Sequence, residues 1–159
     1  GKSKLYLNDF FYPLDGIANW YRIYGRKGFI EYQAVVPFES AYKPIFELLK
    51  MITKSKLGST IAAVKPLAKS GGLISFPIDG FTLAVDFAYS ENLLPLLDQL
   101  DQIVIASEGR VYLAKDARLS GKSFKKMYSS SLETWDLTRE KYQVKQNFTS
   151  AMFNRLSGT

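Results

Sequence analysis

The sequence of 159 residues contains neither cysteine nor histidine. Their absence excludes thiolate nucleophiles, disulfide bonds, imidazole acid–base catalysis and zinc sites of the usual kind. No apolar run reaches the roughly 18 residues that a membrane-spanning helix needs, so we do not expect an integral membrane protein. A composition of 47% hydrophobic and 23% charged residues is typical of a folded globular chain.

The net charge of +6 is distributed unevenly along the chain. Residues 1–109 hold 11 basic and 11 acidic residues, whereas residues 110–159 hold 10 basic and 4 acidic residues. A basic segment of this kind favours a nucleic acid, a membrane surface or an anionic partner. The charge alone leaves these alternatives open.

Hydrophobic periodicity predicts four strands and two long helices. The predicted strands are 29–36, 60–64, 81–87 and 111–113. The predicted helices are 39–54 and 91–107, with Ser40 and Ser90 as N-caps. The βαββαβ order predicts an α+β fold of ferredoxin-like type, in which both helices cover one face of an antiparallel sheet and the first and third strands are central. We expect a mostly extended lead-in with a turn over residues 1–27. We also expect a helical C-terminal segment with short helices from 120 to 128, 131–141 and 147–156.

Alternation along the strands predicts a polar sheet face opposite the helices. Its expected members are Glu31, Gln33, Thr82, Ala84, Asp86 and Lys65. Such a face is either solvated or the floor of a binding site, and on the strands alone the solvated interpretation is the commoner one.

Two further signals point toward ligands. Lys115 follows the predicted strand 111–113, where a charged group can be presented to a ligand, although a surface ion pair with Asp116 or a helix end is the commoner role for such a residue. Residues 27–32 partly match the RNP1 motif of RNA-recognition modules, but on the first strand instead of the third, and Glu31 would repel phosphate. The sequence contains no phosphate-binding glycine loop, dinucleotide fingerprint or metal-ligand cluster.

Several blocks of sequence occur in an order and spacing that resembles a known family. The blocks are 13–20, 24–33, 75–77 with 80–87, 109–116, and 148–150 with 155–156. Together they resemble the C-terminal half of the FAD-linked oxidases of the vanillyl-alcohol oxidase superfamily, and within it the decaprenylphosphoryl-β-D-ribose 2′-oxidase family. The resemblance covers nearly the whole chain.

The resemblance implies a part of a larger enzyme that oxidises an alcohol group of a sugar-like substrate by hydride transfer to FAD. It implies that residues 1–109 form the C-terminal part of the substrate-binding cap domain, and that the basic segment 110–159 docks on an N-terminal FAD-binding domain. That domain would bind most of the FAD, so the isolated chain is expected to be inactive. The implied substrate is a sugar or sugar-lipid, and the implied location is cytoplasmic or peripheral to a membrane through a lipid-linked substrate.

The resemblance also implies roles for individual residues. Lys115 would be catalytic and would contact the flavin together with Tyr112. The implied substrate-binding residues are Gln33, Lys65, Thr82, Ala84 and Phe11. Ala84 and Thr82 match positions that are Cys and Asn in the mycobacterial member of the family, and Glu31 stands where Gln is common. No metal is implied.

Four of these residues, Gln33, Lys65, Thr82 and Ala84, are also members of the polar face predicted by alternation. The agreement between the two routes favours the binding floor over the solvated face. The alternative function is a stand-alone βαββαβ module that binds RNA or a small regulatory ligand, and with the oxidase interpretation no nucleic-acid partner is expected.

Overall fold

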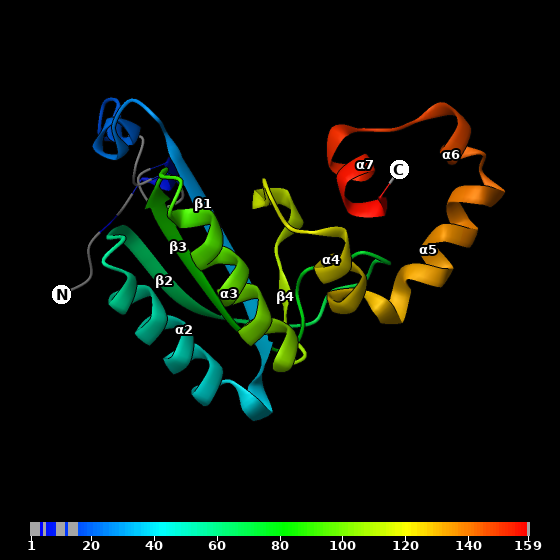
Figure 1. The fold of residues 1–159 in the computed structure, drawn as a ribbon, viewed down its shortest axis with the longest axis horizontal. Coiled ribbons are helices and arrows are strands. Elements are labelled where there is room, and N and C mark those ends of the chain that lie inside the picture. Colours follow the sequence, from blue (N-terminus) through cyan, green and yellow to red (C-terminus); the bar gives the residue numbers. More distant parts are fainter. Residues whose placement is uncertain (1–3, 5, 9–11, 13–15, 159) are drawn as a thin grey trace.

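The structure is a computed structural model that describes residues 4, 6–8, 12 and 16–158, with the side chains of residues 59, 60, 145 and 146 left aside. Its described part contains a four-stranded antiparallel sheet (Figure 1). The strands are β1 (Phe29–Pro37), β2 (Ser59–Leu67), β3 (Gly80–Ala88) and β4 (Arg110–Val111). Their order in the sheet is β2-β3-β1-β4. The predicted central position of β1 and β3 is therefore confirmed.

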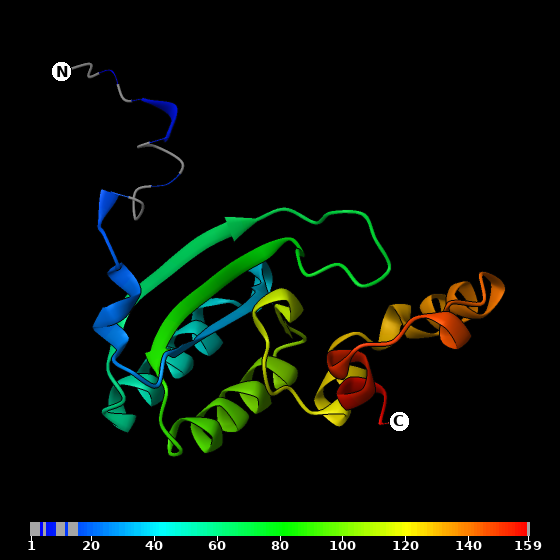
Figure 2. The ribbon, with the colours of Figure 1, turned by 90° about the horizontal axis from the view of Figure 1, so that it is seen from above.

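Helices α2 (Tyr42–Ser55) and α3 (Leu93–Ala106) cover one face of the sheet (Figure 2). Every third or fourth residue of each helix is apolar, and the side chains of Leu48, Leu97 and Leu100 are completely buried. The strands contribute the alternate residues of the same core, namely Tyr32, Ala34, Leu83, Val85 and Phe87. An α+β fold with an antiparallel sheet is thus confirmed, and the other face of the sheet is left for polar groups.

Both predicted helix caps are wrong. Residues Phe38–Ser40 form a separate 3-10 turn, and α2 begins after Ala41 with no side-chain cap. Likewise α3 begins after Asn92, and the hydroxyl of Ser90 is buried without a hydrogen-bond partner. In both cases the proline of the sequence, Pro44 or Pro95, falls in the first turn. The N–H groups of the first turn have no partner within the helix, so a proline, which lacks an N–H, is tolerated there. The position of the proline therefore determines where each helix begins.

The edge strands differ in length from the prediction. Strand β2 continues through Pro66 to Leu67, which is possible because an edge strand can leave the proline nitrogen unpaired. Strand β4 contains only Arg110 and Val111, and the chain then turns into a short 3-10 helix, η4 (Leu113–Lys115). The lead-in, predicted to be mostly extended with a turn, contains a 3-10 helix, η2 (Trp20–Tyr24).

The C-terminal segment is helical, as predicted, and lies to one side of the sheet (Figures 1 and 2). Its helices are α4 (Gly121–Met127), α5 (Ser129–Lys141), α6 (Val144–Asn147) and α7 (Ala151–Ser157). The predicted cap Ser120 is confirmed, because its hydroxyl accepts a hydrogen bond of 3.1 Å from the Ser123 amide. Phe124, Met127 and Leu156 join the core of the sheet layer, whereas α5 buries no residue. The predicted helix 147–156 begins late, because α7 covers only its part from Ala151 onward and α6 ends at Asn147.

Two glycines allow the backbone to close tightly around the end of β1. A Cβ atom on Gly80 would lie 2.1 Å from the carbonyl oxygen of Val36, and one on Gly109 would lie 2.4 Å from that of Val35. Only glycine lets β3 and the turn before β4 approach β1 this closely.

No helix in the described part of the chain is long and apolar enough to cross a membrane.

The helix layer predicts a sharp difference between two adjacent leucines of α2. Leu48 is completely buried and Leu49 is 38% exposed. We expect Leu48→Ala to lower the free energy of unfolding by about 2–5 kcal/mol, because it leaves a cavity under the sheet. The same change at Leu49 should cost less than about 1 kcal/mol. Urea denaturation of both variants measures the difference, and equal losses would contradict the packing described.

Candidate functional site

The strand register brings the predicted polar residues together on the sheet face that α2 and α3 leave uncovered. Cross-strand partners share a face, and Glu31 pairs with Asp86, Gln33 with Ala84, and Lys65 with Thr82. Their common face is therefore confirmed. We call this surface the floor and define it by these six residues.

The centre of the floor is held by side-chain hydrogen bonds. The Gln33 amide donates to the Thr82 hydroxyl at 3.1 Å, and that hydroxyl donates to the Ala34 carbonyl oxygen at 2.8 Å. Thr82 is almost completely buried, whereas Gln33 is only partly so. Thr82 consequently fixes the orientation of the Gln33 amide, and its own hydroxyl is used within the fold. The neighbouring Ala84 is partly buried and adds only a methyl group to the floor.

Two carboxylates lie at one end of the floor. Asp86 is buried, and its carboxylate accepts a hydrogen bond of 2.9 Å from the Tyr24 hydroxyl. Burial raises the pKa of the Asp86 carboxyl above its usual value, and the facing carboxylate of Glu31 adds to the rise, while the hydrogen bond from Tyr24 opposes it. Tyr24 was not identified from the sequence, because it comes from the lead-in, outside any predicted strand.

Lys115 reaches the floor from η4. Its ammonium group forms an ion pair with the Glu31 carboxylate, and about a third of each side chain is exposed. The alternative of a surface pair with Asp116 or a helix end is not what the structure shows, because Lys115 pairs with Glu31 and Asp116 binds Arg155. Lys115 therefore places a positive charge at the end of the floor that holds the two carboxylates.

Tyr112 extends the floor along the outer edge of β1. Its amide donates to the Gln33 carbonyl oxygen at 2.8 Å, and its ring stacks on Phe76 with the centroids 4.5 Å apart. Nearby, the Arg110 guanidinium donates to the Ser75 carbonyl oxygen at 2.8 Å. These contacts hold the loop between β2 and β3 against the side of the floor.

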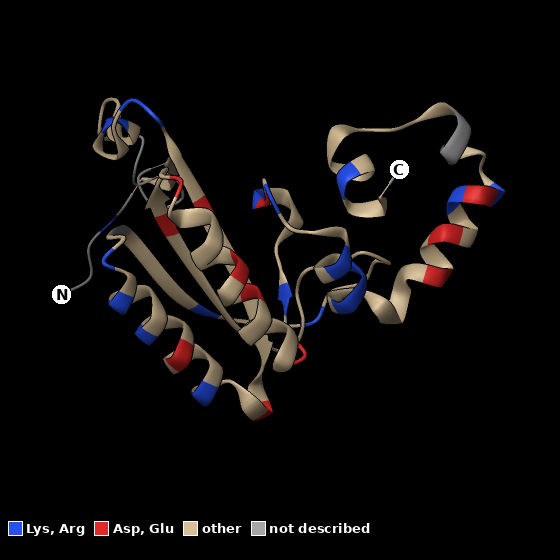
Figure 3. Ribbon diagram, viewed as in Figure 1, with Lys and Arg blue, Asp and Glu red and all other residues tan. Residues whose placement is uncertain are grey.

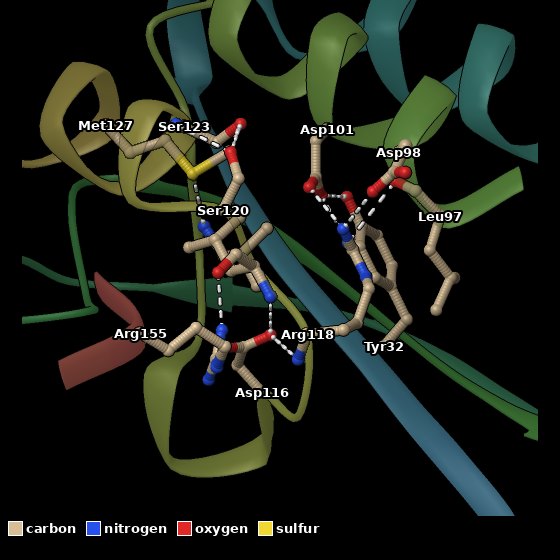
Figure 4. Close-up of polar contacts among 12 residues, drawn as sticks. Tyr32, Leu97, Asp98, Asp101, Asp116, Arg118, Ser120, Ser123, Met127 and Arg155 are labelled. Atoms are coloured by element: carbon tan, nitrogen blue, oxygen red, sulfur yellow. Dashed lines mark hydrogen bonds and ion pairs between the residues drawn. The ribbon is translucent and has the colours of Figure 1, made fainter. Parts of the chain in front are cut away.

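The segment that carries Lys115 is anchored by Arg118 (Figure 4). The guanidinium makes two hydrogen bonds of 2.7 Å to the Asp101 carboxylate, and a third, of 2.8 Å, to Asp98. Asp101 also accepts a hydrogen bond from the Tyr32 hydroxyl at 3.2 Å. Burial raises the pKa of the Asp101 carboxyl, and the hydrogen bonds from Arg118 oppose that rise. The network ties the segment after β4 to α3 and to the back of β1.

Asp116 provides a second anchor beside the first (Figure 4). One of its carboxylate oxygens accepts hydrogen bonds from the amides of Arg118 and Leu119, at 2.9 and 2.7 Å. The other lies 2.9 Å from a guanidinium nitrogen of Arg155 in α7. Lys115 thus sits between a short strand and a turn that is fixed on both sides.

The remaining predicted residues have different outcomes. Lys65 belongs to the floor by register but is exposed on the edge strand β2. Phe11 lies outside the described residues. The boundary at residue 109 and the assigned roles stay predictions. Sequence reasoning missed Asp101 and Arg118, whose only signal was an acidic residue in the otherwise apolar stripe of α3.

A separate groove of about 730 Å³ lies between α2 and α3, away from the floor. It is lined by Lys50, Leu57, Leu96 and Gln99 among others. None of the predicted site residues lines it.

The comparisons with known proteins bear on this arrangement. The chain is similar to an oxidase. It shares 34% identity over 151 residues with decaprenylphosphoryl-beta-D-ribose oxidase of Mycolicibacterium smegmatis, and the match covers 94% of the chain and 32% of that protein. It also shares 36% identity over 88 residues with an uncharacterized protein in the mprA 5′ region of Streptomyces coelicolor, covering 55% of the chain and 24% of that protein. The chain therefore spans about a third of the length of the oxidase. No family model matches.

The side chains at the edge of the floor can be tested against the groups that an FAD molecule presents. Lys115 provides a cation and Tyr112 an aromatic ring at the same edge. A fixed cation of this kind suits the pyrimidine side of a flavin, where negative charge develops on reduction. The sequence carries no glycine-rich loop to hold the two phosphates. The residues present would therefore suit a flavin ring better than the adenosine diphosphate part of FAD.

The Arg118 anchor generates a stability prediction. Arg118→Leu leaves the carboxylate of Asp101, whose side chain is 2% exposed, without its cation. We expect the free energy of unfolding to fall by about 3–5 kcal/mol. The exposed Arg26→Leu should change it by less than about 0.5 kcal/mol. Urea denaturation measures both, and a mild effect at Arg118 would show that the network is not the anchor described.

Asp86 generates a pH prediction. Because its pKa is raised in the folded chain, the folded state holds this proton more tightly, and the stability that Asp86 contributes is lost as the pH rises through the folded-state pKa. Asp86→Asn should remove this loss, so the variant should gain stability relative to the parent between pH of about 4 and 7. Unfolding curves across that range test it, with the exposed Glu91→Gln as control. A constant difference from the parent would refute the assignment.

Proposed function

We propose that this chain supplies the substrate-binding portion of a longer FAD-dependent oxidoreductase, which oxidises an alcohol group of a sugar-like substrate. In this proposal residues 1–109 form the substrate-binding unit, with a sheet of ferredoxin-like order, and residues 110–159 form the docking segment. Two observations together support the proposal. The chain is 34% identical to a ribose oxidase over 94% of its own length. The predicted residues Gln33, Lys65, Thr82 and Ala84 share one sheet face, and Lys115 lies at the end of that face.

The floor supports the binding of a polyhydroxylated substrate. The Gln33 amide, oriented by Thr82, can donate to or accept from a sugar hydroxyl. Ala84 leaves room for the sugar ring above the strand. Lys65, at the exposed edge, offers a cation to an anionic group of the substrate, such as a phosphate.

Lys115 would face both the substrate and the cofactor. When bound, FAD would accept the hydride that leaves the alcohol carbon. The Lys115 ammonium would stabilise the negative charge that develops nearby, an effect that is strong because the charge is held in place before the reaction. Glu31 holds that ammonium group, and its carboxylate is our candidate acceptor for the hydroxyl proton.

The proposed partner is an FAD-binding portion that precedes this chain in the longer polypeptide. The exposed, largely polar α5 supports a docking role for the C-terminal segment, since α5 buries no residue within the chain. The oxidase relative is named for a ribose carried on a decaprenyl phosphate. We therefore propose a sugar on a lipid phosphate as the substrate class, with a location in the cytoplasm or peripheral to a membrane.

No observation favours the alternative of a stand-alone RNA-binding module. The residue of the RNP1-like run that faces the floor, Glu31, is paired with Lys115. The comparisons give the alternative no support. The absence of a nucleic-acid partner stays an untested expectation.

The test uses the complete polypeptide that contains this chain, purified with FAD and mixed anaerobically with pentose phosphate esters. We expect bleaching of the flavin absorbance by at least one ester. Lys115→Ala should slow flavin reduction at least about 100-fold, because it removes the fixed charge. The matched control is Lys54→Ala on α2, on the opposite side of the sheet from the floor, which should reduce flavin at the parent rate.

Two results would contradict the proposal. One is a complete polypeptide that binds no FAD. The other is a Lys115→Ala variant that reduces its flavin as fast as the parent protein does while retaining its fold by circular dichroism.

A further inference from the structure

Apolar side chains are exposed in one continuous strip where α2 meets the edge strand β2. A shallow groove of about 400 Å³ runs along it. The exposed members of the strip are Tyr42, Phe46, Leu49, Phe38, Val64 and Phe81, with exposed fractions of 87, 56, 38, 41, 49 and 37%. We call this surface the α2 strip. Contiguous apolar patches are uncommon on monomeric proteins and mark surfaces that bind something.

The rings of the α2 strip are ordered against one another. Tyr42 and Phe46, one helical turn apart, lie nearly parallel with their centroids 6.4 Å apart. Phe38 meets Phe81 edge to face at 4.9 Å. The strip is therefore an aromatic surface that the fold holds in place, and not a set of scattered apolar residues.

Lysines lie beside the strip. Lys43, Lys50 and Lys54 are exposed on α2, and the exposed Lys56 follows its end. Residues 38–56 hold these four lysines against two glutamates, although residues 1–109 as a whole are neutral. The basic residues along α2 are visible in Figure 3. The surface is thus aromatic along its middle and positively charged along its side.

We propose that the α2 strip binds the surface of an anionic lipid bilayer. Aromatic rings favour the boundary between headgroups and acyl chains, and lysines beside them pair with lipid phosphates. The charge of the surface complements that of anionic headgroups. Peripheral association of this kind needs no membrane-spanning helix.

The edge of β2 argues against a second copy of the chain as the occupant. Copies would join most readily by pairing β2 with β2, but Pro66 removes one donor from that edge. The pairing of β2 with β3 is also irregular between Ser59 and Ala62, and such an irregularity twists an edge away from regular pairing. This surface is therefore suited to binding through the side chains of the strip and not through backbone pairing of β2.

The experiment is co-sedimentation of the complete polypeptide with vesicles. One set contains about 30% phosphatidylglycerol in phosphatidylcholine and the other phosphatidylcholine alone, both at about 0.1 M salt. We expect binding to the anionic set. Tyr42→Ser with Phe46→Ser should weaken it at least about tenfold, because two rings leave the interface. Both residues are largely exposed, so the fold should survive.

The control distinguishes lipid binding by the α2 strip from non-specific attraction due to the net positive charge of the protein. Lys125→Glu with Lys126→Glu reverses two exposed lysines on α4, which has no exposed aromatic strip beside it. We expect Lys50→Glu with Lys54→Glu to abolish binding and the α4 variant to retain it. Equal loss in both charge variants, or full binding by the Tyr42 and Phe46 variant, would overturn the proposal.

Gel filtration tests whether a second copy of the chain occupies the strip. A protein that is dimeric, and becomes monomeric when Tyr42 and Phe46 are replaced, would show that the strip is an interface between copies and would also overturn the proposal. The proposal does not depend on the oxidation chemistry, because the test reads lipid binding and the strip contains no residue assigned to the floor.

Discussion

The candidate site depends on one guanidinium group. Arg118 lies between the Asp101 and Asp98 carboxylates and the carbonyl oxygen of Leu97, so it fastens the turn after β4 to the middle of α3. Strand β4 contains two residues and could not by itself hold that turn. Because Lys115 stands three residues before Arg118, the position of its charge is set by a network on the helix side of the sheet. The buried ion pair of Arg118 with Asp101, on the helix side of the sheet, thereby positions the charged groups on the floor.

Much of this arrangement could be predicted from the sequence, since period-two alternation in Glu31, Gln33, Thr82 and Ala84 depends only on strand geometry. The spacing of leucines in α2 and α3 similarly depends only on helix geometry. The helix starts could not be predicted from Ser40 and Ser90, because a proline in the first turn decided them. The partner of Lys115 could not be predicted either, since Glu31 is 84 residues away and the pair forms only through the sheet. Residue periodicity predicts which side chains share a face of a strand or helix. It does not predict which charged residues, distant in the sequence, form an ion pair.

The contacts of the basic segment 110–159 explain part of its positive charge. Arg118 and Arg155 bind buried or partly buried carboxylates, and Lys115 binds Glu31. Arg139 lies over the rings of Trp135 and Phe153, at 4.7 and 3.8 Å, and joins α5 to α7. Much of the positive charge that first suggested a polyanionic ligand is therefore used inside the chain, to assemble a segment that has little apolar core of its own.

The sheet contains two kinds of position: those that only glycine can occupy, such as Gly80 and Gly109 beside β1, and those where side chains can vary. At those glycines any side chain would collide with a carbonyl oxygen of the central strand. On the floor, by contrast, Glu31, Gln33 and Ala84 stand on the outer surface and are only partly buried. The scaffold can thus stay fixed while the floor is altered one side chain at a time. Such a division makes the surface suited to evolutionary change of specificity, and the same positions are the natural starting points for redesigning what the sheet recognises.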